Sequence, residues 1–266
     1  MFVIRPFVSL CSALALIALA SAPVTNARGP QPGAAAQNAD ARAWTGRVAE
    51  IEAYLRTARI VRTEGTDRGV TKPVRAFLEP GGPISSMTWK AIPPGVSNGF
   101  YESYKSEIAA YEIDKLLALG MVPPKVEREI DGKVGVAVMW VDGAKSFAQL
   151  GKVPRPPPAK AGIWNREIMR AKMFHNLIGD IDPNLGNWLI DPEWRVTLID
   201  QSRALTDTTR LVHEMQQVDR ALWERMLALT ADGLARDLSR WLEPREIRAI
   251  LERRDRMKAK IDRLPR

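Results

Sequence analysis

The sequence predicts an α+β protein with two lobes, a β-rich N-lobe over residues 44–142 and a short helical C-lobe over residues 143–266. Two observations favour this class. Strand-like apolar runs separated by Gly and Pro turns dominate the first lobe. Segments with apolar residues at helical spacing dominate the second. The composition, 45% apolar and 26% charged, is that of a globular protein and excludes a wholly disordered chain.

Residues 1–27 have the pattern of a signal peptide, because an early cation precedes an apolar run at residues 7–20 and small residues follow. This pattern predicts export to the periplasm or secretion. An uncleaved membrane anchor is the alternative, since residues 7–24 are about as long as the shortest spanning helices. Residues 28–43, rich in Pro, Gly and Ala, are interpreted as a flexible linker. Cys11 is the only cysteine, so no disulfide framework is expected.

The N-lobe begins with three strand-like runs at residues 59–63, 74–79 and 87–92, joined by turn-rich loops. We expect these runs to form a three-stranded antiparallel sheet. Residues 104–120 instead have helical spacing and end on a glycine, a typical helix-ending residue. Two further strand-like runs flank the Asp-Gly pair at 131–132, which is the strongest short hairpin signal.

The C-lobe begins with a proline-rich loop and then a helix over residues 163–178. A polar loop, GDIDPNLGN, follows this helix and leads into two more strand-like runs. Helical spacing then returns to the end of the chain, where we expect three helices, at residues 208–230, 232–242 and 244–263.

The polar loop and the two runs after it predict a cation site. Pairing residues 188–190 with 196–199 as a hairpin brings Asn187 opposite Asp200. Crowded carboxylate and amide oxygens repel one another unless a cation, a ligand or hydrogen bonds satisfy them. Mg²⁺ takes such oxygen ligands and keeps its other positions for water and phosphate. Asn187 and Asp200 are therefore the candidate metal ligands, and Asp182 can face the same space.

Over residues 59–205 the chain resembles the protein-kinase-like superfamily, and especially its atypical branches, the phosphoinositide kinases, the HipA-type bacterial kinases and the secretory-pathway kinases. The sequence LIGDIDPNLGN and the later LID are similar to the catalytic stretch of these branches. The chain departs from them at Asp180, where the family often has Asn, and at Asn184, where His is common. We interpret both residues as turn or cap residues.

The resemblance implies a phosphotransferase that uses ATP and Mg²⁺ to move the γ-phosphoryl group to a hydroxyl acceptor. It implies catalytic roles for Asp182 and for Lys90, with Lys90 braced by Glu107 on the following helix. It assigns Mg²⁺ to Asn187 and Asp200. Contacts to the nucleotide are also implied in the interlobe hinge and in the loop between the first two strands, at Gly65, Gly69, Met139, Trp140 and Val141.

Two other classes of function compete with this interpretation. A kinase-like fold that binds a ligand or partner without catalysis is one, because Asn184 replaces the common His, the first loop lacks a GxGxxG motif, and ATP is expected to be scarce outside the cytoplasm. A calcium-binding module is the other, because DIDPN spaces oxygen residues like a calcium loop. Leu185 stands where that loop needs glycine, and a strand-like run follows where it needs a helix.

Several choices stay open from the sequence. Glu112 competes with Glu107 as the partner of Lys90, and the acceptor hydroxyl fits a protein, a lipid or a small molecule. The net charge of +8 is concentrated in the last helix, which fits either a solvated face or contact with an anionic membrane surface. No nucleic acid partner is expected, because no recognised binding motif accompanies this charge. His175 and His213 lack other metal-ligating residues nearby in sequence and are interpreted as structural.

Overall fold

A computed structural model describes Met1 and residues 41–65, 74–182 and 184–264. Residues 2–27 of the expected signal peptide, most of the expected linker, and Gly69 lie outside the described residues. Within the described ranges, no helix is both long enough and apolar enough to cross a membrane.

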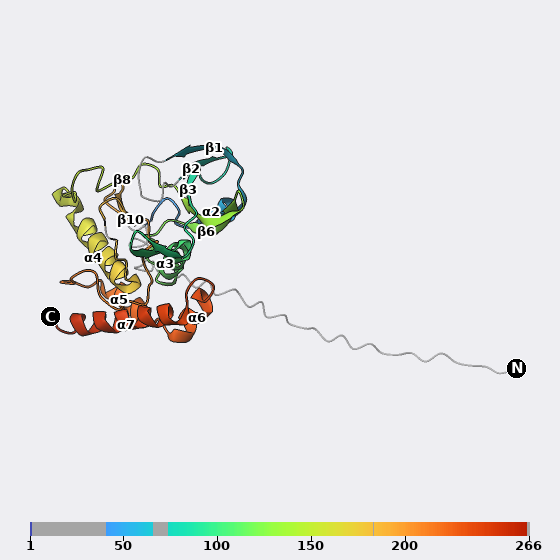
Figure 1. Ribbon diagram of the computed structural model, residues 1–266. Helices are drawn as coiled ribbons and strands as arrows, with labels where there is room; N and C mark the ends of the chain where they lie inside the picture. The colour runs from blue at the N-terminus through green and yellow to red at the C-terminus, as the bar shows by residue number, and fades with distance from the viewer. Residues whose placement is uncertain (2–40, 66–73, 183, 265–266) are drawn as a thin grey trace. The chain divides into compact units, whose positions relative to one another are not determined.

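The N-lobe is built on a five-stranded antiparallel sheet in the order β1-β2-β3-β7-β6 (Figure 1). Its strands are β1 (Ile60–Gly65), β2 (Val74–Leu78), β3 (Ser86–Lys90), β6 (Lys125–Ile130) and β7 (Lys133–Met139). The predicted three-stranded unit and the predicted hairpin are both confirmed. Asp131 and Gly132 have φ angles of 51° and 72°, the positive values that a tight two-residue hairpin turn needs.

One helix packs on each face of this sheet. Successive residues of a strand point to opposite faces, so Ala137 of β7 joins an apolar cluster with α2 (Val48–Thr57), whereas Val136 joins a cluster with α3 (Tyr104–Leu116). The sequence did not lead us to expect α2. It also gave no indication of the short hairpin of β4 (Gly95–Ser97) and β5 (Phe100–Glu102), which precedes α3.

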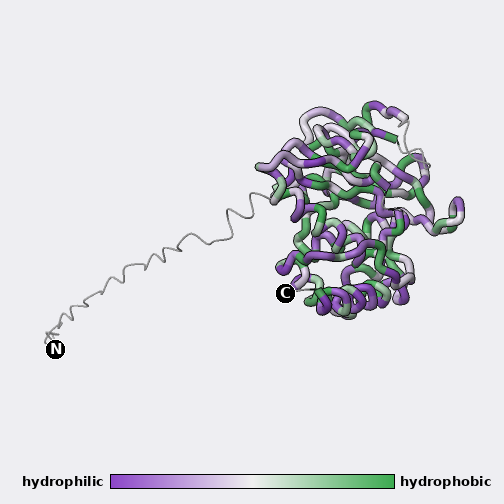
Figure 2. Tube along the Cα trace, turned by 90° about the vertical axis from the view of Figure 1, so that its left-hand side faces the viewer, coloured by the Kyte–Doolittle hydropathy of each residue, from purple (hydrophilic) through white to green (hydrophobic). Residues whose placement is uncertain are grey.

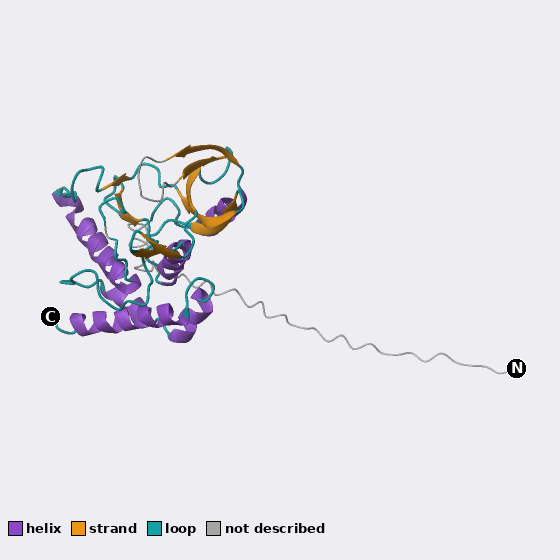
Figure 3. Cartoon of the chain, viewed as in Figure 1, coloured by secondary structure: helices purple, strands orange, loops and turns teal. Residues whose placement is uncertain are grey.

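The C-lobe gathers most of the helices, as Figure 3 shows, around one large apolar cluster. Its elements are β8 (Lys145–Ser146), the short helix η1 (Pro158–Lys160), α4 (Ala161–Ile178), β9 (Trp188–Ile190), β10 (Val196–Leu198), α5 (Arg220–Leu227), α6 (Ala231–Leu238) and α7 (Pro244–Ile261). The hairpin of β9 and β10 and the helix α4 confirm the expectations for this part of the chain.

The helix expected over residues 208–230 is wrong for its first half, because only α5 is helical and residues 201–219 form an irregular segment. The side chain of Asn176 in α4 binds backbone N–H groups of this segment. The Asn176 Oδ1 atom accepts hydrogen bonds from the backbone N–H groups of Val212, at 2.8 Å, and His213, at 2.7 Å. These N–H groups are therefore bonded to α4 and not to carbonyl groups of a helix of their own.

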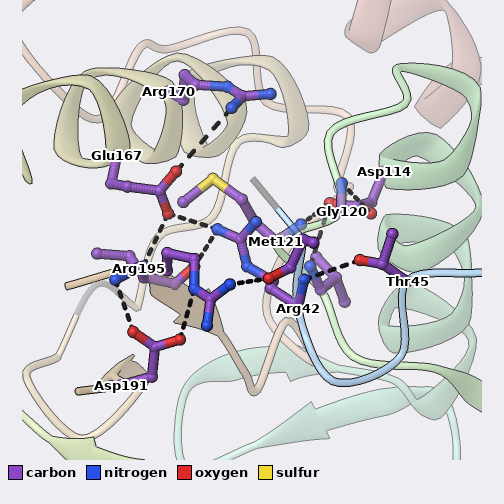
Figure 4. A network of polar contacts seen from close by, with 12 residues as sticks. Arg42, Thr45, Asp114, Gly120, Met121, Glu167, Arg170, Asp191 and Arg195 are labelled. Carbon is purple, nitrogen blue, oxygen red and sulfur yellow. Dashed lines mark hydrogen bonds and ion pairs between the residues drawn. The ribbon is translucent and has the colours of Figure 1, made fainter. Parts of the chain in front are cut away.

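A buried ion pair anchors the first described residues to the C-lobe (Figure 4). Arg42 contacts Glu167 of α4 and donates a hydrogen bond to the carbonyl oxygen of Val196 at 2.8 Å. The Glu167 carboxylate also accepts from the N–H of Val196 at 2.8 Å. Arg42 falls in the range that the sequence assigned to a linker, yet it is only 6% exposed. Folded structure thus begins before the expected residue 44.

A second buried carboxylate connects the lobes. Asp114 of α3 accepts backbone hydrogen bonds from Gly120, Met121 and Val122 at 2.9–3.1 Å. Burial raises the pKa of Asp114 to about 6 even though these bonds favour its charged form. The carbonyl oxygen of Met121 in turn accepts from the N–H of Leu198 in β10 at 2.9 Å. The end of α3 is thereby fixed against the hairpin of the C-lobe.

We predict that Glu167→Ala lowers the free energy of unfolding by about 3–5 kcal/mol, because it removes the buried carboxylate that contacts the Arg42 charge and accepts from the Val196 N–H. The change is measured by urea denaturation followed by tryptophan fluorescence. Glu50→Ala is the matched control, since it breaks the exposed Arg47–Glu50 pair and should change stability little. Equal effects of the two substitutions would contradict an anchoring role for the buried pair.

Candidate active site

Lys90, at the end of β3, lies between two carboxylates. Its Nζ atom donates to Glu107 Oε1 of α3 at 2.8 Å and lies 2.9 Å from Asp200 Oδ1. Burial opposes the charge of the ammonium group, but Asp200 and Glu107 outweigh it and raise the pKa of Lys90 above its ordinary value. The structure thus brings together three residues that the sequence singled out. Glu112, the competing partner, instead pairs with Lys115 at 3.1 Å.

A second buried lysine, which sequence reasoning missed, completes this cluster. Lys125, the first residue of β6, contacts Glu107 Oε2 and donates to Gln201 Oε1 at 2.5 Å. Burial opposes the charge of Glu107, but Lys125 and Lys90 outweigh it and hold the pKa of Glu107 well below its usual range. Burial also lowers the pKa of Lys125. We call Lys90, Glu107, Lys125 and Gln201 the lysine cluster.

The candidate catalytic residue Asp182 lies in the loop between α4 and β9 and is held by an arginine. Its carboxylate accepts from Arg203 Nη1 at 3.1 Å and from Asn184 Nδ2 at 3.2 Å. The Arg203 Nε atom also donates to Glu102 Oε1 of β5 at 2.7 Å, and its guanidinium group lies over the ring of Phe100. Arg203 and Glu102, neither of them expected from the sequence, therefore tie this loop to the β4–β5 hairpin.

The two candidate metal ligands lie at the open end of the β9–β10 hairpin. The N–H of Ile199 donates to the carbonyl oxygen of Asn187 at 3.0 Å, which places Asn187 beside the strand end that leads to Asp200. The Asn187 Nδ2 atom donates to the carbonyl oxygen of Asp182 at 3.1 Å, so the amide Oδ1 is left as an acceptor. The side chain of Asp200 is 34% exposed. This donor set of one amide and one carboxylate oxygen suits a hard cation.

Among the described residues, no group of three or more His, Cys, Asp or Glu side chains is placed to hold a metal ion. An ion at Asn187 and Asp200 would therefore take its further ligands from water or phosphate oxygens. The calcium-loop alternative fails in the structure, because the loop leads into strand β9 where a calcium loop of that type needs a helix.

The expected nucleotide contacts are only partly available. Gly65 is the last residue of β1, where the described part of the first loop ends. In the hinge, the N–H of Met139 donates to the carbonyl oxygen of Pro124 at 2.9 Å, and the N–H of Trp140 donates to that of Ser86 at 3.2 Å. Two of the three hinge N–H groups are thus engaged within the protein. Val141 packs at the edge of the N-lobe core.

Asp180, the first carboxylate of the catalytic loop, is fully buried. Its Oδ1 atom accepts from the N–H of Asp182 at 3.1 Å, which is the turn role expected from the sequence. Its Oδ2 atom lies 3.8 Å from His175 Nε2. Burial raises the pKa of Asp180 to about 8 and lowers the pKa of His175 to about 3. At neutral pH both side chains are therefore mainly uncharged. Asp180 holds the loop through its bond to Asp182, and His175 lies beside Asp180.

We predict that Asp180→Asn makes the stability of the protein less sensitive to pH. The folded chain keeps a proton on Asp180 that the unfolded chain loses above its ordinary pKa, so raising the pH from about 4 to 8 destabilises the fold by up to about 1.4 kcal/mol per unit. The free energy of unfolding of the variant should equal that of the parent near the lower pH and exceed it near the higher one. Urea denaturation across this range measures both free energies, and the effect of His175 largely cancels because both proteins carry it. A gap between the two free energies that does not change with pH would contradict the raised pKa of Asp180.

The chain shares its fold with the Golgi casein kinase and with hydra Fam20, which confirms the predicted two-lobed kinase-like fold class and the predicted resemblance. The chain is similar to the Golgi casein kinase, with a TM-score of 0.53 and 12% identity over 82% of this chain and 76% of that one. It is similar to hydra Fam20 solved with a sugar, with a TM-score of 0.57 and 13% identity over 81% of this chain and 88% of that one.

A third structure, the Golgi casein kinase with Mn and ADP bound, has a TM-score of 0.54 and 13% identity over 80% of this chain and 75% of that one. No protein-family model matches the chain, and no curated protein is significantly similar to it. At these identities the likeness is one of fold, so the activity has to be argued from the site.

Proposed function

We propose that the protein is a phosphotransferase that uses ATP and Mg²⁺ to phosphorylate a hydroxyl acceptor. One observation supports this phosphotransferase activity most strongly. The lysine cluster contacts Asp200 within a kinase-like fold. Glu107 holds Lys90 extended toward Asp200, as a phosphate-binding lysine has to be held. An ion pair of Lys90 and Glu107 with a purely structural role would not need Lys125 as a second buried lysine, nor the Asp200 carboxylate, which is 34% exposed.

A nucleotide and a divalent ion fit the donor groups of this chain. The Golgi casein kinase structure with Mn and ADP supports both by similarity of fold. Asn187 and Asp200 would hold Mg²⁺, which when bound would neutralise charge on the phosphate groups. Lys90 would supply the remaining positive charge, because its ion pair with Asp200 can be shared with a phosphate oxygen.

Asp182 is the proposed catalytic residue. It orients the acceptor hydroxyl and accepts its proton while the hydroxyl oxygen bonds to the γ-phosphorus and ADP leaves. Arg203 fixes the carboxylate in place through its 3.1 Å bond. We propose a protein, lipid or small-molecule hydroxyl as the acceptor. Export to the periplasm or secretion belongs to the same proposal and agrees with the fold shared with the Golgi casein kinase.

A second candidate function is nucleotide binding without transfer. It is favoured by the Arg203–Asp182 ion pair, because Arg203 Nη1 already occupies a carboxylate oxygen that would otherwise accept the proton of a hydroxyl. Asn184 in place of the common His points the same way. In that case the lysine cluster and the pair Asn187 and Asp200 would keep their binding roles, and Asp182 would only support the loop.

We predict that the protein binds ATP in the presence of Mg²⁺ and that Asp200→Ala abolishes this Mg²⁺-dependent binding. Calorimetric titration of ATP with and without Mg²⁺ measures it. Asp255→Ala removes a carboxylate that is 64% exposed on α7 and serves as the matched control, which should bind like the parent. If the parent and the Asp255→Ala control both fail to bind ATP with any cation, the proposed nucleotide site is wrong.

We predict that Asp182→Asn keeps ATP binding but slows phosphoryl transfer by about 100-fold or more, because it removes the proton acceptor. Transfer is followed as labelled phosphate moving from ATP to water, to the protein itself or to candidate acceptors. Equal transfer by the variant and the parent would contradict the catalytic role. A parent that binds ATP and transfers to none of these would support the second candidate function.

A further inference from the structure

A cavity of about 650 Å³ opens between the irregular segment before α5 and the C-terminal part of α7. It has no lining residue in common with the candidate active site. Its polar lining consists mainly of cations and hydroxyl groups, from Thr208, Thr209, Arg210, Arg256, Lys260 and Arg263.

The lining of this cavity carries an excess of positive charge. Arg256 and Lys260 are four residues apart, which places them on one face of the largely hydrophilic helix α7 (Figure 2), and Arg263 follows in the turn after the helix ends. Within the described part of the chain, none of the four lining cations is in an ion pair, whereas Arg254 and Lys258 of the same helix do have acidic partners. Glu214 is the single carboxylate of the lining. Like charges at this spacing destabilise a helix unless an anion offsets them.

The wall of the cavity opposite α7 is fixed in place by buried polar contacts. Arg253, which is fully buried in α7, donates to the carbonyl oxygens of Thr206 at 3.1 Å and Thr208 at 2.5 Å. Asn176 Nδ2 donates to the carbonyl oxygen of His213 at 2.9 Å, and the His213 ring stacks on His175. The cavity is therefore formed before any ligand arrives, which lowers the entropic cost of binding.

We propose that this cavity is a binding site for a small ligand that carries several phosphate groups. Guanidinium and ammonium groups with neighbouring hydroxyls are the donors that recognise phosphate oxygens, and the volume suits a small molecule. A concave site with a fixed wall favours a discrete soluble ligand over a flat lipid surface. A phosphorylated lipid headgroup presents the same phosphate groups as a soluble ligand. The experiment below therefore tests a soluble probe and lipid vesicles separately. This site is independent of the proposed phosphoryl transfer.

The test uses myo-inositol hexakisphosphate as the soluble probe, titrated into the protein by calorimetry at physiological salt. The double variant Arg256→Gln/Lys260→Gln should weaken binding about tenfold or more, because it removes two of the charges that face the cavity. The control Arg245→Gln/Arg248→Gln removes the same charge from α7 outside the cavity and should stay within about twofold of the parent. Asp200→Ala should bind the probe like the parent, which separates this site from the ATP site.

Vesicles of phosphatidylcholine with and without a phosphoinositide provide the second arm. Soluble binding that the cavity variant loses supports a free ligand, and vesicle binding lost by the same variant supports a lipid headgroup as its source. The proposal is overturned if the parent binds neither probe, or if the control variant loses as much binding as the cavity variant. The substituted cations are exposed, so circular dichroism should show unchanged folding in both variants.

Discussion

The structure depends most on one buried carboxylate, Glu107, which lies between the ammonium groups of Lys90 and Lys125. A charge at this depth costs several kcal/mol unless it is paired, so α3, β3 and β6 are constrained to meet at this point. Lys125 also donates to Gln201, the residue after Asp200. The same cluster therefore builds the N-lobe and connects it to the candidate metal ligand in the C-lobe.

Polar contacts add to the shared apolar core in holding the parts of the candidate site in register. Asp114 and Met121 fix the end of α3, the helix that carries Glu107, against β10, the strand that leads to Asp200. Arg203 does the same on the other side, where it connects the Asp182 loop to the β4–β5 hairpin. A site held in this way is rigid before a ligand binds, which favours catalysis by positioning and electrostatics.

Much of this arrangement could be predicted because its signals are local. Turn residues marked the strands, and the spacing from Asp182 to Asn187 and Asp200 marked the loop and hairpin. Lys125 was missed because a lysine at a strand start is usually exposed; only the pairing of β6 with β7 shows that it shares a face with Val138. Arg203 could not be predicted, since its partner Glu102 lies 101 residues away.

A crystal structure of the protein with ADP and Mn²⁺ would test the proposed site most directly. We expect phosphate oxygens within hydrogen-bond distance of Lys90 Nζ and the ion bound by Asn187 and Asp200, with the Lys90–Glu107 contact retained. Nucleotide bound away from the lysine cluster, or an ion held by other residues, would contradict the proposed site and would leave the cluster as a purely structural device.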